Sequence, residues 1–220
     1  MIITRAQRAC LVAVRLADVQ QRGMKRWLYR GLEEGAAREA KAVLDSHYGE
    51  LMIRTGSQVD ANTVPSMLAS LAGRDEIEVV DLILVVHGDQ DQLVFGQSRI
   101  DAPTFGRRIA HTGVSSQLRL VYSTACYGAQ HNDDFLAAGF RAAIGAVRKN
   151  TNGLSEFRSL LASWSRGVPI APALGAADRP AQRAVWDRLA MWFGGFSDVD
   201  SRKVLAGNGR HDQGVLADIV

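Results

Sequence analysis

Two stretches decide the fold of this chain: DLILVVHG at residues 81–88 and LRLVYSTACYG at residues 118–128. Each contains a short apolar run rich in β-branched residues, which is typical of a strand that is buried on both faces. The first run stops at His87, and the second leads to Cys126. In open α/β sheets, ligands bind outside the carboxyl ends of the strands. The sequence therefore predicts that His87 and Cys126 meet at one edge of a sheet.

The rest of the chain alternates candidate strands with helical patterns. Further strands are predicted at 8–15, 51–55, 93–96, 142–147 and 202–206. Helices are predicted at 36–48, 63–71, 103–111, 133–140, 155–166 and 179–193, where apolar residues recur at helical spacing. Such alternation favours βαβ units, a mostly parallel sheet, and right-handed crossovers with helices on both faces.

Two segments of the N-terminal quarter are less regular. The run at 8–15 suits a buried strand better than the alternative, a helix over 4–21. The basic and aromatic segment 20–35 is predicted to be a loop or a short irregular helix. The tryptophans at 164, 186 and 192 lie at helical spacing among apolar residues, and we expect them in the core.

The composition is that of a folded globular protein. Of 220 residues, 47% are hydrophobic and 22% charged, and the net charge of +3 comes from scattered Lys and Arg residues, so we expect no nucleic-acid partner. No apolar run approaches the roughly 20 residues of a bilayer span, and the N-terminus lacks the order of a secretion signal. We therefore predict a cytoplasmic protein with no membrane partner. Cys10 lies in an apolar run and is expected to be a small buried hydrophobe.

The pairing of His87 with Cys126 indicates nucleophilic chemistry. A cysteine attacks as its thiolate, and it needs a nearby base because an ordinary thiol is mostly protonated at neutral pH. A glycine beside the histidine leaves its N–H unobstructed, so the amides of Gly88 and Cys126 are candidate oxyanion donors. Each residue alone could be structural, as a strand-ending histidine or a buried thiol. Their matching positions favour a cysteine–histidine hydrolase.

These motifs resemble those of the caspase-like (clan CD) cysteine peptidases, which include caspases, metacaspases, clostripain-type peptidases and CHAT domains. In that group an apolar strand ends in His-Gly, and a later strand ends in a small residue and Cys, often followed by x-Gly. Here VVHG at 85–88 and ACYG at 125–128 match, and Cys126 lies 39 positions after His87. The resemblance is strong over 8–147 and weak afterwards, and its bacterial CHAT, metacaspase and clostripain-type members are the most similar in pattern.

The resemblance implies a three-layer, caspase-haemoglobinase-like α/β fold with a mostly parallel sheet. It implies one domain over 1–220, with a core at 1–150 that holds the dyad and C-terminal helices and a tail at 151–220. Cys126 would be the nucleophile and His87 the general base and then the general acid. Gly88 and Cys126 would supply the oxyanion donors, and no metal or cofactor would be needed. The substrate would be a protein or peptide, and a regulatory protein partner is a further expectation.

In many relatives the residue two before the nucleophile forms part of the pocket for the substrate side chain. Here it is Thr124, which carries no charge. Asp18, Asp89 or Asp91 could supply an acid instead, although each could also be an ordinary solvated carboxylate. His131 is a weaker candidate for a second base and is expected to be an exposed loop residue.

The resemblance leaves two readings of function. The first is an active endopeptidase that, by analogy with stand-alone relatives, serves a regulated bacterial process such as defence or programmed death. The second is a catalytically silent member that binds a partner. A weaker third is another α/β hydrolase or a redox protein that uses Cys126.

Overall fold

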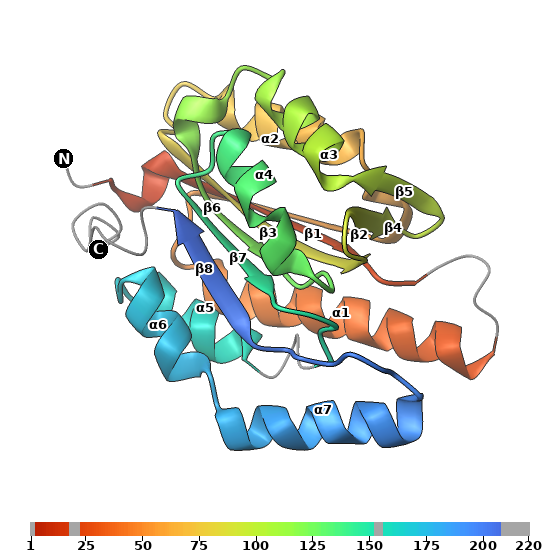
Figure 1. Ribbon diagram of the computed structural model, residues 1–220. Coiled ribbons are helices and arrows are strands. Elements are labelled where there is room, and N and C mark those ends of the chain that lie inside the picture. Colours follow the sequence, from red (N-terminus) through yellow and green to blue (C-terminus); the bar gives the residue numbers. More distant parts are fainter. Residues whose placement is uncertain (1–2, 18–22, 152–155, 208–220) are drawn as a thin grey trace.

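The computed structural model describes residues 3–17, 23–151 and 156–207 of the chain. Within them, the main sheet has the order β2-β1-β3-β6-β7-β8, and β4 and β5 form a hairpin attached to β3 (Figure 1). Neighbours on the main path are parallel except β7 and β8. The strands are β1 (Arg8–Arg15), β2 (Glu50–Thr55), β3 (Val79–Gly88), β4 (Gln92–Phe95), β5 (Ser98–Asp101), β6 (Leu118–Ser123), β7 (Ala142–Ala146) and β8 (Lys203–Gly207). The predicted mostly parallel sheet is confirmed.

The central strands are buried because helices cover both faces of the sheet. Helices α2, α3 and α4 lie on one face, and α1, α5 and α6 lie on the other (Figure 1). Side chains of β1 alternate between the two cores: Leu11 packs on the α2 side, and Cys10 and Val12 pack on the α1 side. Cys10 is fully buried, as expected from its apolar neighbours, and it is a free thiol. The helices are α1 (Met24–Leu44), α2 (Thr63–Ala72), α3 (Ala102–Ala110), α4 (Asn132–Ala137), α5 (Phe157–Ser165), α6 (Ile170–Ala177) and α7 (Pro180–Gly194).

Helix α1 corrects the prediction of a loop or short irregular helix at 20–35, because it is continuous from Met24. Its inward positions later in the helix are apolar and buried, but one turn earlier the inward position is a glutamate, Glu33. The Glu33 carboxylate accepts hydrogen bonds from the N–H groups of Leu16 (2.7 Å) and Ala17 (2.9 Å), just after β1. A buried charge therefore interrupts the apolar pattern from which a helix is predicted.

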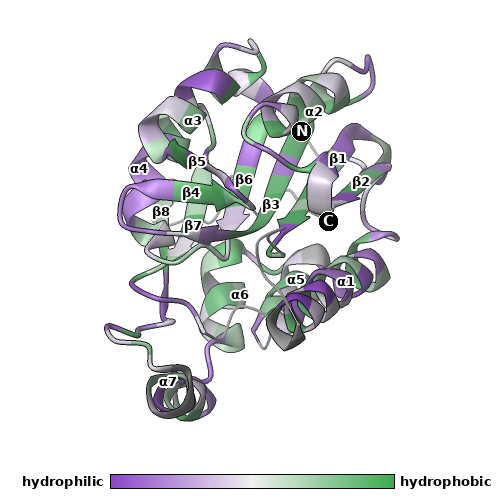
Figure 2. Cartoon of the chain, turned by 90° about the vertical axis from the view of Figure 1, so that its right-hand side faces the viewer, coloured by the Kyte–Doolittle hydropathy of each residue, from purple (hydrophilic) through white to green (hydrophobic). Residues whose placement is uncertain are grey.

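The C-terminal helices include one unpredicted element and correct one further prediction. Helix α6 was not predicted, since its sequence contains a proline and a glycine and directly follows a second proline. The three tryptophans were all expected in the core, but only Trp164 is buried, whereas Trp186 is 47% and Trp192 is 84% exposed. Both exposed tryptophans belong to α7, which lies apart from the layered core (Figure 2).

Helix α7 turns its polar side toward the body of the protein. Asp187 accepts hydrogen bonds from Thr151 and Ser201, and Arg183 forms an ion pair with Asp178. The apolar stripe, which includes Val185 and Leu189, consequently faces outward. Helical periodicity predicts that such a stripe exists, but not which way it turns. None of the helices in the described ranges is long and apolar enough to cross a bilayer.

Candidate active site

The structure brings the predicted dyad to adjacent strand ends. Strands β3 and β6 are parallel neighbours, and their register ends with Leu84 opposite Ser123. The N–H of Thr124 then donates to the carbonyl of Leu84 at 2.9 Å. His87 and Cys126 each lie three residues beyond the last register pair, so both emerge at the carboxyl edge of the sheet.

Gly88 lies directly against the cysteine loop. A Cβ atom placed on Gly88 would lie 2.6 Å from the carbonyl oxygen of Cys126 and 2.8 Å from the Cβ of Ala125. Only glycine fits this approach without moving the loop. The residue after the histidine therefore touches the backbone of the predicted nucleophile.

The His87 ring is held from two sides. Its Nε2 lies 2.9 Å from the carbonyl oxygen of Leu16, just after β1. A carbonyl only accepts, so Nε2 carries the hydrogen of this bond, and in the neutral ring Nδ1 holds the lone pair. The Tyr29 ring packs edge-on against the imidazole, with ring centroids 5.0 Å apart and planes at 87°. The hydrogen bond to the Leu16 carbonyl fixes the tautomer of His87, and the contact with Tyr29 fixes the orientation of the His87 ring.

Tyr29 is a site residue that the sequence did not reveal. It lies on α1, within the segment for which no regular helix was predicted, and it is half-buried. Burial raises the pKa of the Tyr29 hydroxyl, and the nearby Cys126 raises it further. Tyr29 thus contacts His87 and lies close enough to Cys126 for the two groups to interact electrostatically. No motif of the sequence marks an aromatic residue about sixty positions before the histidine.

Cys126 is half-buried, and its sulfur has a defined donor. The backbone N–H of Asn150 donates to Cys126 Sγ at 3.4 Å, and the Asn150 Nδ2 donates to the carbonyl of Thr124 at 2.8 Å. Burial raises the pKa of the Cys126 thiol, while the Asn150 N–H and the cations of Lys203 and Lys149 act in the opposite direction. The thiol therefore rests protonated at neutral pH, and a base must take its proton when it reacts.

A strained turn follows the cysteine. Tyr127 adopts the left-handed conformation (φ 56°), which a non-glycine residue rarely adopts. Its N–H donates to the carbonyl of Arg148 at 2.8 Å, and its hydroxyl donates to Asp198 at 2.7 Å, a bond that raises the pKa of Tyr127 to about 12. The next residue, Gly128, packs against the backbone of Gly145 in β7. Backbone strain of this kind is common where a reactive residue is presented.

The amide of Cys126 differs from its neighbours. The N–H groups of residues 124, 125, 127 and 128 all have hydrogen-bond acceptors, whereas among the described residues the N–H of Cys126 has none. The Gly88 amide points away from β4, because Asp89 and Gln92 exchange hydrogen bonds and the pairs of an antiparallel ladder alternate. The N–H of Cys126 is therefore open to an acceptor from outside the described residues, and the role of Gly88 as a second oxyanion donor stays a prediction.

The predicted substrate-binding residues are placed differently. Thr124 is 8% exposed, and its carbonyl is held by Asn150. Asp89 is exposed beside the site, with one carboxylate oxygen accepting the N–H of Gln90 within the hairpin turn (2.9 Å), and Asp91 lies in the same exposed turn. Asp18 falls outside the described residues.

His131 was expected to be exposed, but it is only 1% exposed. Its Nε2 lies 3.0 Å from the carbonyl of Asp89 and 3.2 Å from that of Gln90, so the imidazole supports the turn that follows His87. A side chain that is buried to this extent is not available as a second base for a substrate. Its short 3-10 helix (Gly128–His131) turns it inward, which loop polarity alone does not indicate.

Comparison with known proteins supports the fold. No family model matches the chain, and no curated protein matches its sequence. Solved structures do match. One is the crystal structure of caspase-1 from Spodoptera frugiperda, with a TM-score of 0.58 and 9% sequence identity over 94% of this chain and 88% of that chain. At such low identity the likeness shows the fold alone, which is a caspase-like α/β fold.

The described residues contain no cluster of histidine, cysteine, aspartate or glutamate that could hold a metal ion. The arrangement at the strand ends comprises a thiol, an oriented imidazole and the Cys126 amide, which has no acceptor among the described residues. These are the groups that acyl transfer to a cysteine requires. The finer resemblance to CHAT, metacaspase and clostripain-type proteins stays a prediction.

Proposed function

We propose that this chain is a cysteine endopeptidase, with Cys126 as nucleophile and His87 as general base and acid. One observation carries the proposal: the N–H of Cys126, alone in residues 124–128, lacks an acceptor within the described part of the chain, and it lies beside Gly88 at the edge where His87 emerges. The caspase-like fold is consistent with a cysteine peptidase. It does not by itself assign the activity.

The first half of the reaction forms an acyl-enzyme. Nδ1 of His87 takes the thiol proton as Cys126 Sγ attacks the carbonyl carbon of the scissile peptide bond. The new C–S bond turns the carbonyl oxygen into an oxyanion, which accepts hydrogen bonds from the amides of Cys126 and Gly88. His87 then gives its proton to the leaving nitrogen as the C–N bond breaks, and a thioester remains.

The second half releases the product. Water attacks the thioester while His87 accepts one of its protons, and the same amides stabilise the second oxyanion. The C–S bond breaks, and His87 returns the proton to Cys126. The hydrogen bond from His87 Nε2 to Leu16 keeps Nδ1 as the working nitrogen throughout both halves.

The substrate would be a protein or peptide, and its side-chain preference would depend on the exposed turn at Asp89 more than on buried Thr124. A role in a regulated bacterial process and a regulatory protein partner belong to the same proposal. They rest on the resemblance of the His-Gly and Ala-Cys-x-Gly motifs.

Incubation with a diverse peptide library, followed by mass spectrometry, tests the activity. The wild-type chain and the Cys10→Ala variant, which changes only a fully buried thiol, are expected to cleave the same bonds. Cys126→Ala should abolish cleavage, and His87→Ala should reduce it by about a hundredfold or more, the range for a lost general base.

Cleavage that persists in Cys126→Ala would contradict the assignment. If a correctly folded wild-type chain cleaves no bond of the library, the reading as a catalytically silent, partner-binding domain replaces the peptidase.

A further inference from the structure

Hydrogen bonds on two consecutive residues, Asn150 and Thr151, connect the outlying helix α7 to the sulfur of Cys126. In α7, Asp187 Oδ1 accepts the hydroxyls of Thr151 (2.8 Å) and Ser201 (2.6 Å), and its Oδ2 accepts the N–H of Ser201 (3.3 Å). The N–H of Thr151 donates to Ser201 Oγ at 2.8 Å. One carboxylate therefore gathers two segments that are fifty residues apart in the sequence.

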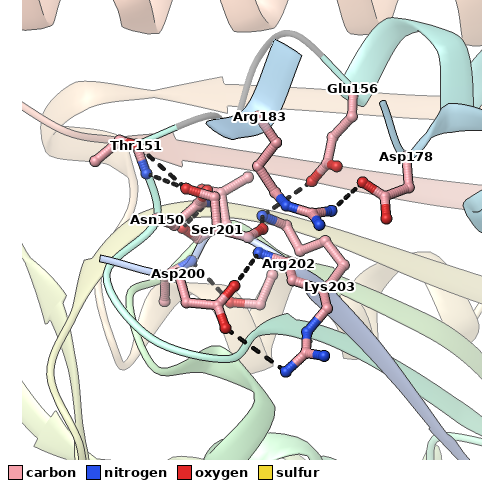
Figure 3. Close-up of polar contacts among 12 residues, drawn as sticks. Asn150, Thr151, Glu156, Asp178, Arg183, Asp200, Ser201, Arg202 and Lys203 are labelled. Carbon is pink, nitrogen blue, oxygen red and sulfur yellow. Dashed lines mark hydrogen bonds and ion pairs between the residues drawn. The ribbon is translucent and has the colours of Figure 1, made fainter. Parts of the chain in front are cut away.

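The segment that Asp187 holds through Thr151 includes the residue that contacts Cys126. Asn150 directly precedes Thr151, and its N–H is the group that donates to Cys126 Sγ at 3.4 Å. Figure 3 shows Asn150, Thr151 and Ser201 side by side. Ser201 is completely buried, so its hydroxyl is committed to this network. The placement of the Asn150 N–H depends on both of its ends, the side-chain clamp on Thr124 and the anchor on Asp187.

We propose that Asp187 is a positioning residue for Cys126, acting through Thr151 and Ser201 to hold the Asn150 N–H on the sulfur. This rests on the proposed role of Cys126 as nucleophile, and it adds control of that nucleophile from α7. The N–H favours the thiolate over the thiol, because a donor stabilises the charged form of its acceptor. Without the anchor, the segment relaxes and this stabilisation is lost.

The sign of the effect separates positioning from charge. Asp187 is negative, so if its charge alone mattered, removing it would favour the thiolate and lower the pKa of Cys126. Loss of the Asn150 hydrogen bond has the opposite effect and raises the pKa of Cys126. A purely structural role for Asp187 would change the stability of the fold and leave the pKa of the thiol unchanged.

The measurement is the rate of alkylation by iodoacetamide as a function of pH, which requires no turnover. Cys10 is fully buried, and Cys126→Ala supplies the background rate. In Asp187→Ala, the pH midpoint is expected to rise by about one pH unit, the scale of a lost hydrogen bond to a charged atom. The rate at pH 7 should fall about threefold, because a less acidic thiol is also intrinsically more nucleophilic.

Two control variants make the test specific, one at Asp178, which precedes α7, and one at Asp187 itself. Asp178→Ala removes the partner of Arg183, the other polar tether of α7, and should leave the midpoint at its wild-type value. Asp187→Asn keeps an oxygen that can accept from Thr151 and Ser201, and should stay near the wild-type midpoint. If Asp187→Ala does not fold, Thr151→Val and Ser201→Ala each remove one bond of the network and should raise the midpoint by a smaller amount.

An unchanged or lowered midpoint in Asp187→Ala, or in both single-bond variants, overturns the proposal. An equal rise in Asp178→Ala also overturns it, because any loosening of α7 would then suffice. Since alkylation reports on the thiol alone, these outcomes are distinct from a failure of the peptidase assignment, which only the peptide library detects.

Discussion

Strands β3 and β6 have a polar pair near each end. The two pairs differ in burial and in how fully their polar atoms are hydrogen-bonded. Toward the start of the strands, Asp81 and Arg119 form an ion pair with side chains that are 0% and 2% exposed. Asp81 also accepts hydrogen bonds from the Tyr48 hydroxyl (2.8 Å) and from the N–H of Leu120 (3.1 Å). At the other end, His87 and Cys126 are half-buried.

This difference is the one expected between a structural pair and the reactive pair that we propose. At the starting end, the carboxylate accepts several donors, and Arg119 lies over the Trp164 ring at 5.4 Å, so the charges are fixed inside the fold. At the carboxyl end, the Cys126 amide lacks an acceptor within the described residues, and the thiol has one weak donor. The first end should therefore control stability, and the second should control reactivity.

Asp81→Ala should have the largest effect on stability. It leaves the Arg119 guanidinium buried without its partner, and removal of one member of a buried pair costs about 3 to 5 kcal/mol. Cys126→Ala should change the free energy of unfolding by about 1 kcal/mol or less. Urea denaturation measures both, and equal losses in the two variants would remove the distinction between the ends.

Gly145→Ala should follow in size. A Cβ at this position in β7 would overlap the backbone of Gly128 in the cysteine loop, and overpacking of a well-filled site costs about 1 to 3 kcal/mol. Gly175 of α6 has no atom within 4 Å of an added Cβ, so Gly175→Ala should stabilise the protein by about 0.5 to 1 kcal/mol. Opposite shifts of the melting temperature are expected, and a stable Gly145→Ala protein would show that the cysteine loop tolerates displacement.

His131 gives the carboxyl end a dependence on pH. Burial lowers the pKa of His131, so the folded state disfavours its protonation. The unfolded chain then binds more protons below its ordinary pKa of about 6.5, and stability falls as the pH drops from there, by at most about 1.4 kcal/mol per pH unit. Denaturation at pH 7 and pH 5 should show a smaller loss for His131→Gln than for the wild type. An identical loss would mean that His131 is readily protonated in the fold.

Tyr29 should have the smallest effect, confined to reactivity. Tyr29→Ala removes the ring that packs against His87, and an aromatic contact is worth about 0.5 to 1.5 kcal/mol. The rate of peptide cleavage should fall several-fold. Tyr29→Phe keeps the ring and should cleave at close to the wild-type rate. A large loss in the phenylalanine variant would instead give the hydroxyl a direct part in the reaction.

The sequence was sufficient to predict the sheet and the edge of the sheet at which His87 and Cys126 lie. Buried parallel strands have a distinctive signal, because residues such as those at 82–86 are continuously apolar, and polar residues directly after them mark the carboxyl edge. The burial of Cys10 followed from the same signal. The short final strand suggested at 202–206 is present as β8, although it is an antiparallel edge strand that lacks this signal.

Other features depend on contacts between distant residues. Asp81 lies inside an apolar strand, and nothing local indicates that Arg119 neutralises it. Tyr29 and Glu33 are placed by packing of α1 against β1 and the strand ends, and the orientation of α7 is set by Asp187 and its distant partners. The periodicity of a helix gives its stripes but not the element that each stripe contacts.

Trapping of the acyl-enzyme tests the central claim most directly. The chain is mixed with activated peptidyl esters, and intact-mass and peptide-mapping spectrometry locates any acyl group. We expect a single acyl group on Cys126 that turns over in the wild type, and none in Cys126→Ala. In His87→Ala, acylation should be slower by about a hundredfold. Absence of an acyl group on Cys126 in the wild type, or acylation at an unchanged rate without His87, would contradict the account.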